Sequence, residues 1–72
     1  MIQKIELVTL TDVRRFVDIV SSREGDIRLI DGKGYVINGK SILGAMAALE
    51  WSSLYVMSEH DIYNKIREFI VK

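Results

Sequence analysis

The sequence predicts an α+β domain in which one mixed or antiparallel sheet carries its helices on a single face. Two observations predict this class. The chain has 72 residues, enough for one hydrophobic core, so we take residues 1–72 as a single domain. Its apolar residues change periodicity in the order strand, helix, strand, strand, helix, strand, helix. A domain of this size has too few helices to cover both faces of a sheet.

The first strand and first helix are expected over residues 2–10 and residues 11–22. In the strand, Ile5 and Leu7 alternate with charged neighbours, as in a half-buried strand. Thr11 is the expected N-cap of the helix, and Asp12 is favourably placed at the positive end of the helix dipole. The apolar residues of this helix repeat at spacings of three and four: Val13, Phe16, Val17 and Val20.

A β-hairpin is expected next. After a turn at residues 23–25, Ile27 and Leu29 alternate with polar residues and predict the second strand. Residues 31–34, Asp-Gly-Lys-Gly, supply the backbone conformations of a tight reversal. The third strand follows at residues 35–37.

Two more helices and one strand complete the expected order. Residues 42–49 favour a helix, with Ser41 as its N-cap. Residues 54–57 are predicted to form the fourth strand. Ser58 and Asp61 fit a capping box before a final helix, whose apolar stripe is Ile62, Ile66, Phe69 and Ile70.

The composition excludes several kinds of site. With no cysteine and one histidine, the chain is expected to hold no disulfide, no metal ion and no cofactor. Ten basic residues balance ten acidic ones, so there is no broad positive field, and we expect no nucleic-acid partner. The adjacent Arg14 and Arg15 fit a solvated helix face. The alternative is a small anion-binding or RNA-binding patch formed with Arg23 and Arg28.

Membrane association is not expected either. The longest apolar run, residues 42–49, is about a third of a membrane span. The opening residues 1–6 carry an acid where the apolar stretch of a signal peptide should begin. We therefore expect a cytoplasmic protein.

The run from Gly39 to Met46, Gly-Lys-Ser-Ile-Leu-Gly-Ala-Met, follows the hairpin in the expected element order. In this order and in this run the chain resembles the HPr family, the histidine-containing phosphocarriers of the bacterial sugar phosphotransferase system. The resemblance implies an open-faced β-sandwich, with a four-stranded antiparallel sheet of order 1-4-2-3 and three helices on one face. The partners it implies are proteins of the phosphotransferase system or regulatory proteins.

One departure from the family removes its chemistry. The family's phosphoacceptor is a histidine in a His-Ala-Arg-Pro sequence between the first strand and the first helix. Here the junction contains Thr9, Leu10, Thr11 and Asp12, with neither histidine nor proline. Asp12 would repel an incoming phosphate. We therefore expect a degenerate family member that is not an enzyme and has lost the carrier role.

The single histidine lies elsewhere, in the expected cap before the last helix. His60 with Glu59 and Asp61 lacks a third converging ligand, so a cap is the expected role. An active phosphocarrier that uses His60 is a third hypothesis.

Ser41 matches the position at which many family members are phosphorylated by a dedicated kinase. A phosphate on an N-cap serine would lie at the positive end of a helix, beside Lys40. Ser41 is thus a candidate regulatory phosphorylation site. The alternative is that its hydroxyl is only a helix cap.

The helix at residues 42–49 is apolar on all sides, and a small domain cannot cover it completely. The resemblance implies that Ile42, Leu43 and Met46 dock partner proteins. The alternative is a structural homodimer formed by the same helix, or a face on which small alanines expose little area. Trp51 could extend the exposed patch or could cap the core.

Overall fold

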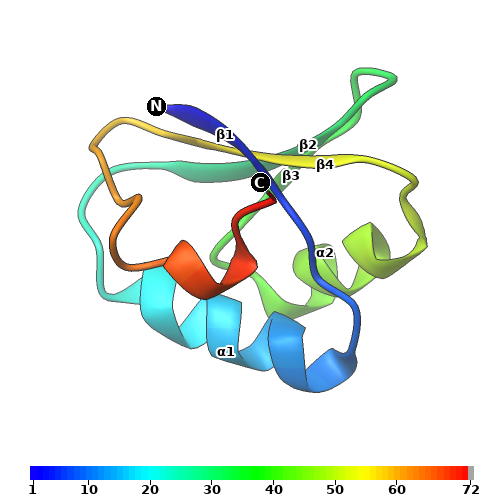
Figure 1. Cartoon of the computed structure of the whole chain (residues 1–72), viewed down its shortest axis with the longest axis horizontal. Helices are drawn as coiled ribbons and strands as arrows, with labels where there is room; N and C mark the ends of the chain where they lie inside the picture. Colours follow the sequence, from blue (N-terminus) through cyan, green and yellow to red (C-terminus); the bar gives the residue numbers. More distant parts are fainter. Residues whose placement is uncertain (72) are drawn as a thin grey trace.

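The computed structural model describes residues 1–71 and shows a four-stranded antiparallel sheet with two α-helices packed against one face (Figure 1). The strands are β1 (Ile2–Ile5), β2 (Ile27–Asp31), β3 (Val36–Asn38) and β4 (Leu54–Ser58). The helices are α1 (Leu10–Ser21) and α2 (Ile42–Ala47), and α2 continues into a 3₁₀ turn, Ala48–Glu50. The α+β class is confirmed.

The strand order across the sheet is β1-β4-β2-β3, which confirms the expected order 1-4-2-3. The central strand β4 pairs with β1 on one side and with β2 on the other, with Val56 opposite both Gln3 and Leu29. The predicted hairpin joins β2 to β3, with Leu29 opposite Ile37. Its turn depends on Gly34, which has a φ of +99° in the left-handed region.

The core lies between the sheet and the helices. Alternate residues of β2 and β4 point into it, because side chains alternate between the two faces of a strand. Phe16 of α1 is fully buried there and meets Phe69 edge to face, with ring centroids 5.7 Å apart. The fully buried large side chains are Ile5, Val13, Phe16, Val20, Ile27, Leu29, Val56 and Ile66.

The expected third helix is absent from the described residues. β4 extends through Ser58, so Ser58 is a strand residue and the predicted capping box is wrong. Isolated turns follow, and then a short 3₁₀ helix at Arg67–Phe69. The predicted apolar stripe does reach the core, since Ile62, Ile66 and Phe69 are buried and Ile70 is partly buried.

Pairing with β1 explains why this segment does not continue as an α-helix. The Glu6 N–H donates to the Phe69 carbonyl at 2.8 Å, and the Val71 N–H donates to the Lys4 carbonyl at 3.2 Å. Ile70 forms a β-bridge with Ile5 between these bonds. The Phe69 carbonyl and the Val71 N–H therefore bond to the outer edge of β1, while the N–H groups of Phe69 and Ile70 still bond to the preceding turn.

The first strand is shorter than predicted, because β1 ends at Ile5 rather than near Leu10. Leu7 is still buried, as the alternation predicts, but α1 already begins at Leu10. Neither helix within residues 1–71 has the length and apolar character required to cross a bilayer.

Candidate functional site

Helix α2 is capped by Ser41, as the sequence predicts. Ser41 has an extended backbone, with φ −101° and ψ 121°, and its Oγ accepts a hydrogen bond from the Gly44 N–H at 3.2 Å. Its carbonyl accepts the Ala45 N–H at 2.8 Å. The hydroxyl therefore satisfies one of the amide donors that a helix leaves free at its start.

Three large apolar side chains of α2 face away from the core. Leu43 is 82% exposed, Ile42 is 42% exposed and Met46 is 39% exposed, while Ala45 and Ala48 are buried against the core. Met46 lies four residues after Ile42 and three after Leu43, so the three side chains are neighbours on one side of the helix. We call Ile42, Leu43 and Met46 the α2 surface.

Two residues beside α2 are engaged elsewhere. Trp51 is half-buried and packs against the core cluster, which favours the core-capping alternative for this residue. The Lys40 ammonium donates to the Arg23 carbonyl at 2.7 Å, which ties the start of α2 to the loop after α1. The Lys40 ammonium therefore binds a backbone oxygen in this structure.

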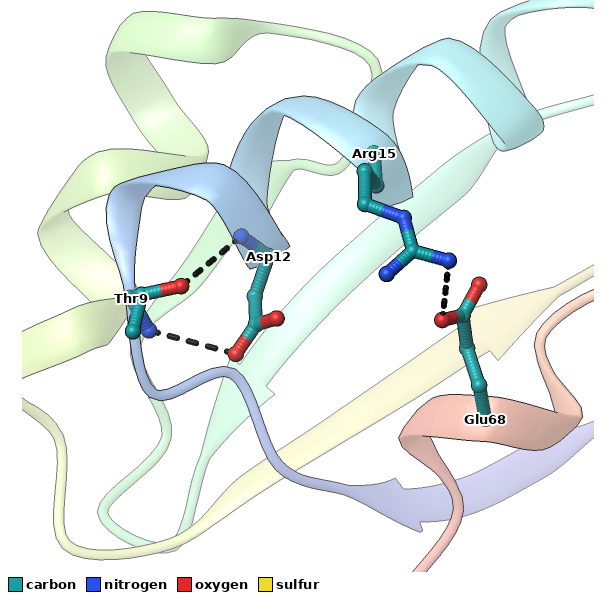
Figure 2. A network of polar contacts seen from close by, with 4 residues as sticks. All are labelled: Thr9, Asp12, Arg15 and Glu68. Carbon is teal, nitrogen blue, oxygen red and sulfur yellow. Dashed lines mark hydrogen bonds and ion pairs between the residues drawn. The ribbon is translucent and has the colours of Figure 1, made fainter.

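The β1–α1 junction holds a capping box centred on Thr9 (Figure 2). Thr9 Oγ1 accepts the Asp12 N–H at 3.1 Å, and Asp12 Oδ2 accepts the N–H groups of Thr9 at 3.2 Å and Val8 at 3.0 Å. Thr9 is the N-cap, so the expectation of Thr11 is wrong. Leu10 is the first helical residue and Thr11 lies in the first turn; both are exposed.

The sequence carries the signal for this cap in its Thr-x-x-Asp spacing at residues 9–12. The alternation of Ile5 and Leu7 favoured a longer strand, and that moved the expected cap by two residues. What decides the position is the reciprocal pair of bonds, which only Thr9 and Asp12 can form.

The Asp12 carboxylate is a stabilised anion at the start of α1. Hydrogen bonds from the backbone amides of Val8 and Thr9 lower the pKa of Asp12 below its ordinary value. The helix start thus already carries a negative charge that interacts favourably with the helix dipole. A second anion at this point would meet like-charge repulsion.

The arginines on α1 do not gather into an anion site. Arg15 pairs with Glu68 at 2.5 Å, and this contact joins α1 to the Arg67–Phe69 turn (Figure 2). Both side chains are partly exposed, so the pair contributes at most about 1 kcal/mol to stability. Arg14 is exposed on the same helix.

His60 lies in the turn after β4 and is exposed. It is not part of a helix cap: the Ser58 hydroxyl donates to the His60 carbonyl at 2.5 Å, and no helix starts there. In residues 1–71 no three acidic or histidine side chains are grouped so as to hold a metal ion. The structure does not bring His60 together with the β1–α1 junction in any hydrogen bond or ion pair among these residues.

Comparison of the chain with protein-family models, with curated proteins and with solved structures gives no match.

Proposed function

We propose that this chain is an HPr-like protein that binds another protein through the α2 surface and does not carry phosphate on histidine. The partner class is a protein of the sugar phosphotransferase system or a regulatory protein. The sheet order β1-β4-β2-β3, with both helices on one face, supports the proposal, although the third helix that the resemblance implies is absent from the described residues (Figure 1).

The observation that carries the proposal is the exposure of Leu43. At 82% exposed it is the most exposed large apolar residue described, and it lies between Ile42 and Met46 on a short helix. Burying one leucine side chain contributes about 1.5–3 kcal/mol. Such a side chain, with two apolar neighbours, is suited to act as the centre of a contact.

The β1–α1 junction supports the second half of the proposal. A phosphohistidine at the start of a helix depends on free amide donors and a positive environment. Here Asp12 supplies a carboxylate at that place and the Thr9 hydroxyl takes the Asp12 amide. For a transferred phosphoryl group at this place, the Asp12 N–H is already bonded to the Thr9 hydroxyl, and the Asp12 carboxylate is a negative charge beside it.

Phosphorylation of Ser41 stays a prediction within this proposal. The Ser41 hydroxyl is half-buried and already accepts a hydrogen bond from Gly44. A kinase would therefore act on a serine that holds the start of the α2 surface, so phosphorylation would alter the surface next to it.

Two experiments test the proposal. The first incubates the chain with phosphoenolpyruvate and the first enzyme of the phosphotransferase system, and the expected result is no acid-labile phosphoryl group. Its appearance would contradict the loss of carrier function.

The second experiment compares capture of phosphotransferase-system and regulatory proteins by wild type, Leu43→Asp and Ile2→Asp. Ile2 is 67% exposed but lies on β1, at the opposite edge of the sheet from β3, and α2 packs next to β3, so Ile2 is a matched control for surface hydrophobicity away from the α2 surface. We expect Leu43→Asp to lose at least tenfold in affinity, which corresponds to about 1.4 kcal/mol, and Ile2→Asp to bind as wild type. Equal binding by all three would refute a role for the α2 surface.

A further inference from the structure

β3 is an edge strand whose outward backbone N–H groups have no partner in the sheet, although the outward Asn38 carbonyl accepts the Ser41 N–H at 3.2 Å. Its bonds to β2 use alternate residues: the Asp31 N–H donates to the Tyr35 carbonyl at 3.0 Å, and the Gly39 N–H donates to the Ile27 carbonyl at 2.7 Å. In an antiparallel ladder the residues between these turn their N–H groups the other way. The N–H groups of Val36 and Asn38 therefore face away from the sheet, where a further strand could accept them.

The other edge of the sheet is partly covered. Residues 69–71 bond to the outer side of β1 through Glu6 and Lys4, with Ile70 bridged to Ile5. In the described part of the chain, β3 is therefore the less protected edge.

The β3 edge lacks the features that usually prevent edge pairing. Residues 35–38, Tyr-Val-Ile-Asn, carry no charge, and the chain has no proline. Tyr35 is 68% exposed and Val36 is 51% exposed. Natural edges are generally protected by lysine, proline or a bulge.

We propose that two copies of this chain associate by antiparallel pairing of their β3 edges about a two-fold axis at Val36. In this register the Val36 residues of the two copies pair with each other, and Asn38 of each copy lies opposite Gly34 of the other. Two-fold pairing uses both free edges at once, so the assembly closes at two copies.

The open face of the sheet favours a second copy as the occupant. Ile30 lies opposite Val36 in the β2–β3 pair, so both side chains are on the face away from the helices. Pairing at Val36 extends this apolar row directly into the same row of the second copy. Residues 35–38 carry no charge, so this register places no two charged side chains directly opposite each other across the axis.

The contact is small, because β3 has three residues. It covers less than the roughly 1,600 Å² of a standard protein interface, so association is reversible and concentration-dependent.

Sedimentation of the whole chain alone, from about 10 μM to about 1 mM, tests this association. The average mass of the wild type is expected to rise from 8.2 kDa toward twice that value. Val36→Lys is expected to stay at the single-chain mass, because the lysine places like charges at the axis. Leu43→Asp, which alters the α2 surface, is expected to associate as wild type.

Three outcomes would overturn the proposal: a wild-type mass that stays constant, association of Val36→Lys equal to wild type, or loss of association in Leu43→Asp. The last would place the contact on the α2 surface. Since no other protein is present, failure here is distinct from failure of partner binding.

A measurement on the wild type alone removes any dependence on folding of the variants. Amide exchange at Val36 and Asn38 should be several-fold slower at the high concentration than at the low one, while exposed amides of α1 should not change. Equal rates for Val36 and Asn38 at both concentrations would also overturn the proposal.

Discussion

Phe69→Ala is expected to remove a large part of the stability of this fold. Phe69 is 5% exposed and meets Phe16 at a centroid distance of 5.7 Å and an interplanar angle of 75°. Replacing a buried phenylalanine by alanine costs about 3–5 kcal/mol, of which the aromatic pair accounts for about 0.5–1.5 kcal/mol. A chain of 72 residues has a free energy of unfolding of about 4–11 kcal/mol. The variant should therefore lose between about a quarter and all of its stability.

Urea unfolding followed by far-ultraviolet circular dichroism and by the fluorescence of Trp51 measures this loss. With a slope of about 1 kcal/mol per molar urea, the midpoint should fall by about 3 M or more. Tyr63→Ala is the control, because Tyr63 belongs to the same segment but is 38% exposed. A loss below about 1 kcal/mol for Phe69→Ala, or equal losses for both variants, would refute the assignment of Phe69 to the core.

Four further predictions concern local features. The pKa of Asp12 is lowered from its ordinary value of 3.8, so its stabilising effect is complete above that value and is lost as the pH falls through the folded-state pKa. The melting temperatures of wild type and Asp12→Asn should thus converge below about pH 4, and a constant difference down to pH 2 would contradict this. Gly39→Ala should cost about 1–3 kcal/mol, since its Cβ would lie 2.7 Å from Ile27 Cγ2 and 3.1 Å from the Ile27 carbonyl oxygen. Gly34→Asn should cost less than about 1 kcal/mol in the same denaturation assay, because Gly34 lies in open space and asparagine tolerates a left-handed backbone. Ser41→Ala should cost about 1 kcal/mol, and no change would mean that the Gly44 amide is satisfied without the hydroxyl.

Local patterns predicted the β2–β3 turn and the α2 cap, whose bonds are local, although the equally local cap of α1 was placed two residues too late. The β2–β3 turn needs only its own residues: Asp31 Oδ1 accepts the N–H groups of Lys33 at 2.8 Å and Tyr35 at 2.9 Å. The α2 cap likewise depends on Ser41 and the residues just after it. These features could be read from the sequence because nothing distant competes for the same groups.

The final segment could not be predicted in this way. Its apolar spacing is helical and its buried residues are those expected, but Phe69 and Val71 bond to Glu6 and Lys4, more than 60 residues earlier in the chain. Ser58 was expected to cap a helix, yet its N–H bonds to the Met1 carbonyl at 2.9 Å as part of the sheet. Long-range pairing overrides helix propensity here, and a pattern confined to a short window does not contain it.

The candidate site was predicted in part. The sequence identified an apolar helix that the domain could not fully cover, and its resemblance to the HPr family pointed to Ile42, Leu43 and Met46. The covering of the β1 edge by residues 69–71 was not foreseen, because it pairs segments from the two ends of the described chain. That covering becomes visible only once the whole sheet is assembled.

The position of β1 between β4 and residues 69–71 also bears on the order in which the fold can form. The partners of β1 lie roughly 50 residues or more further along the chain, so its ladder closes a long loop. The two helices and the β2–β3 hairpin, in contrast, need only nearby residues. Pairing of β1 is therefore expected to be a late step of folding, because the entropy of the loop is lost before the contacts of the ladder are gained.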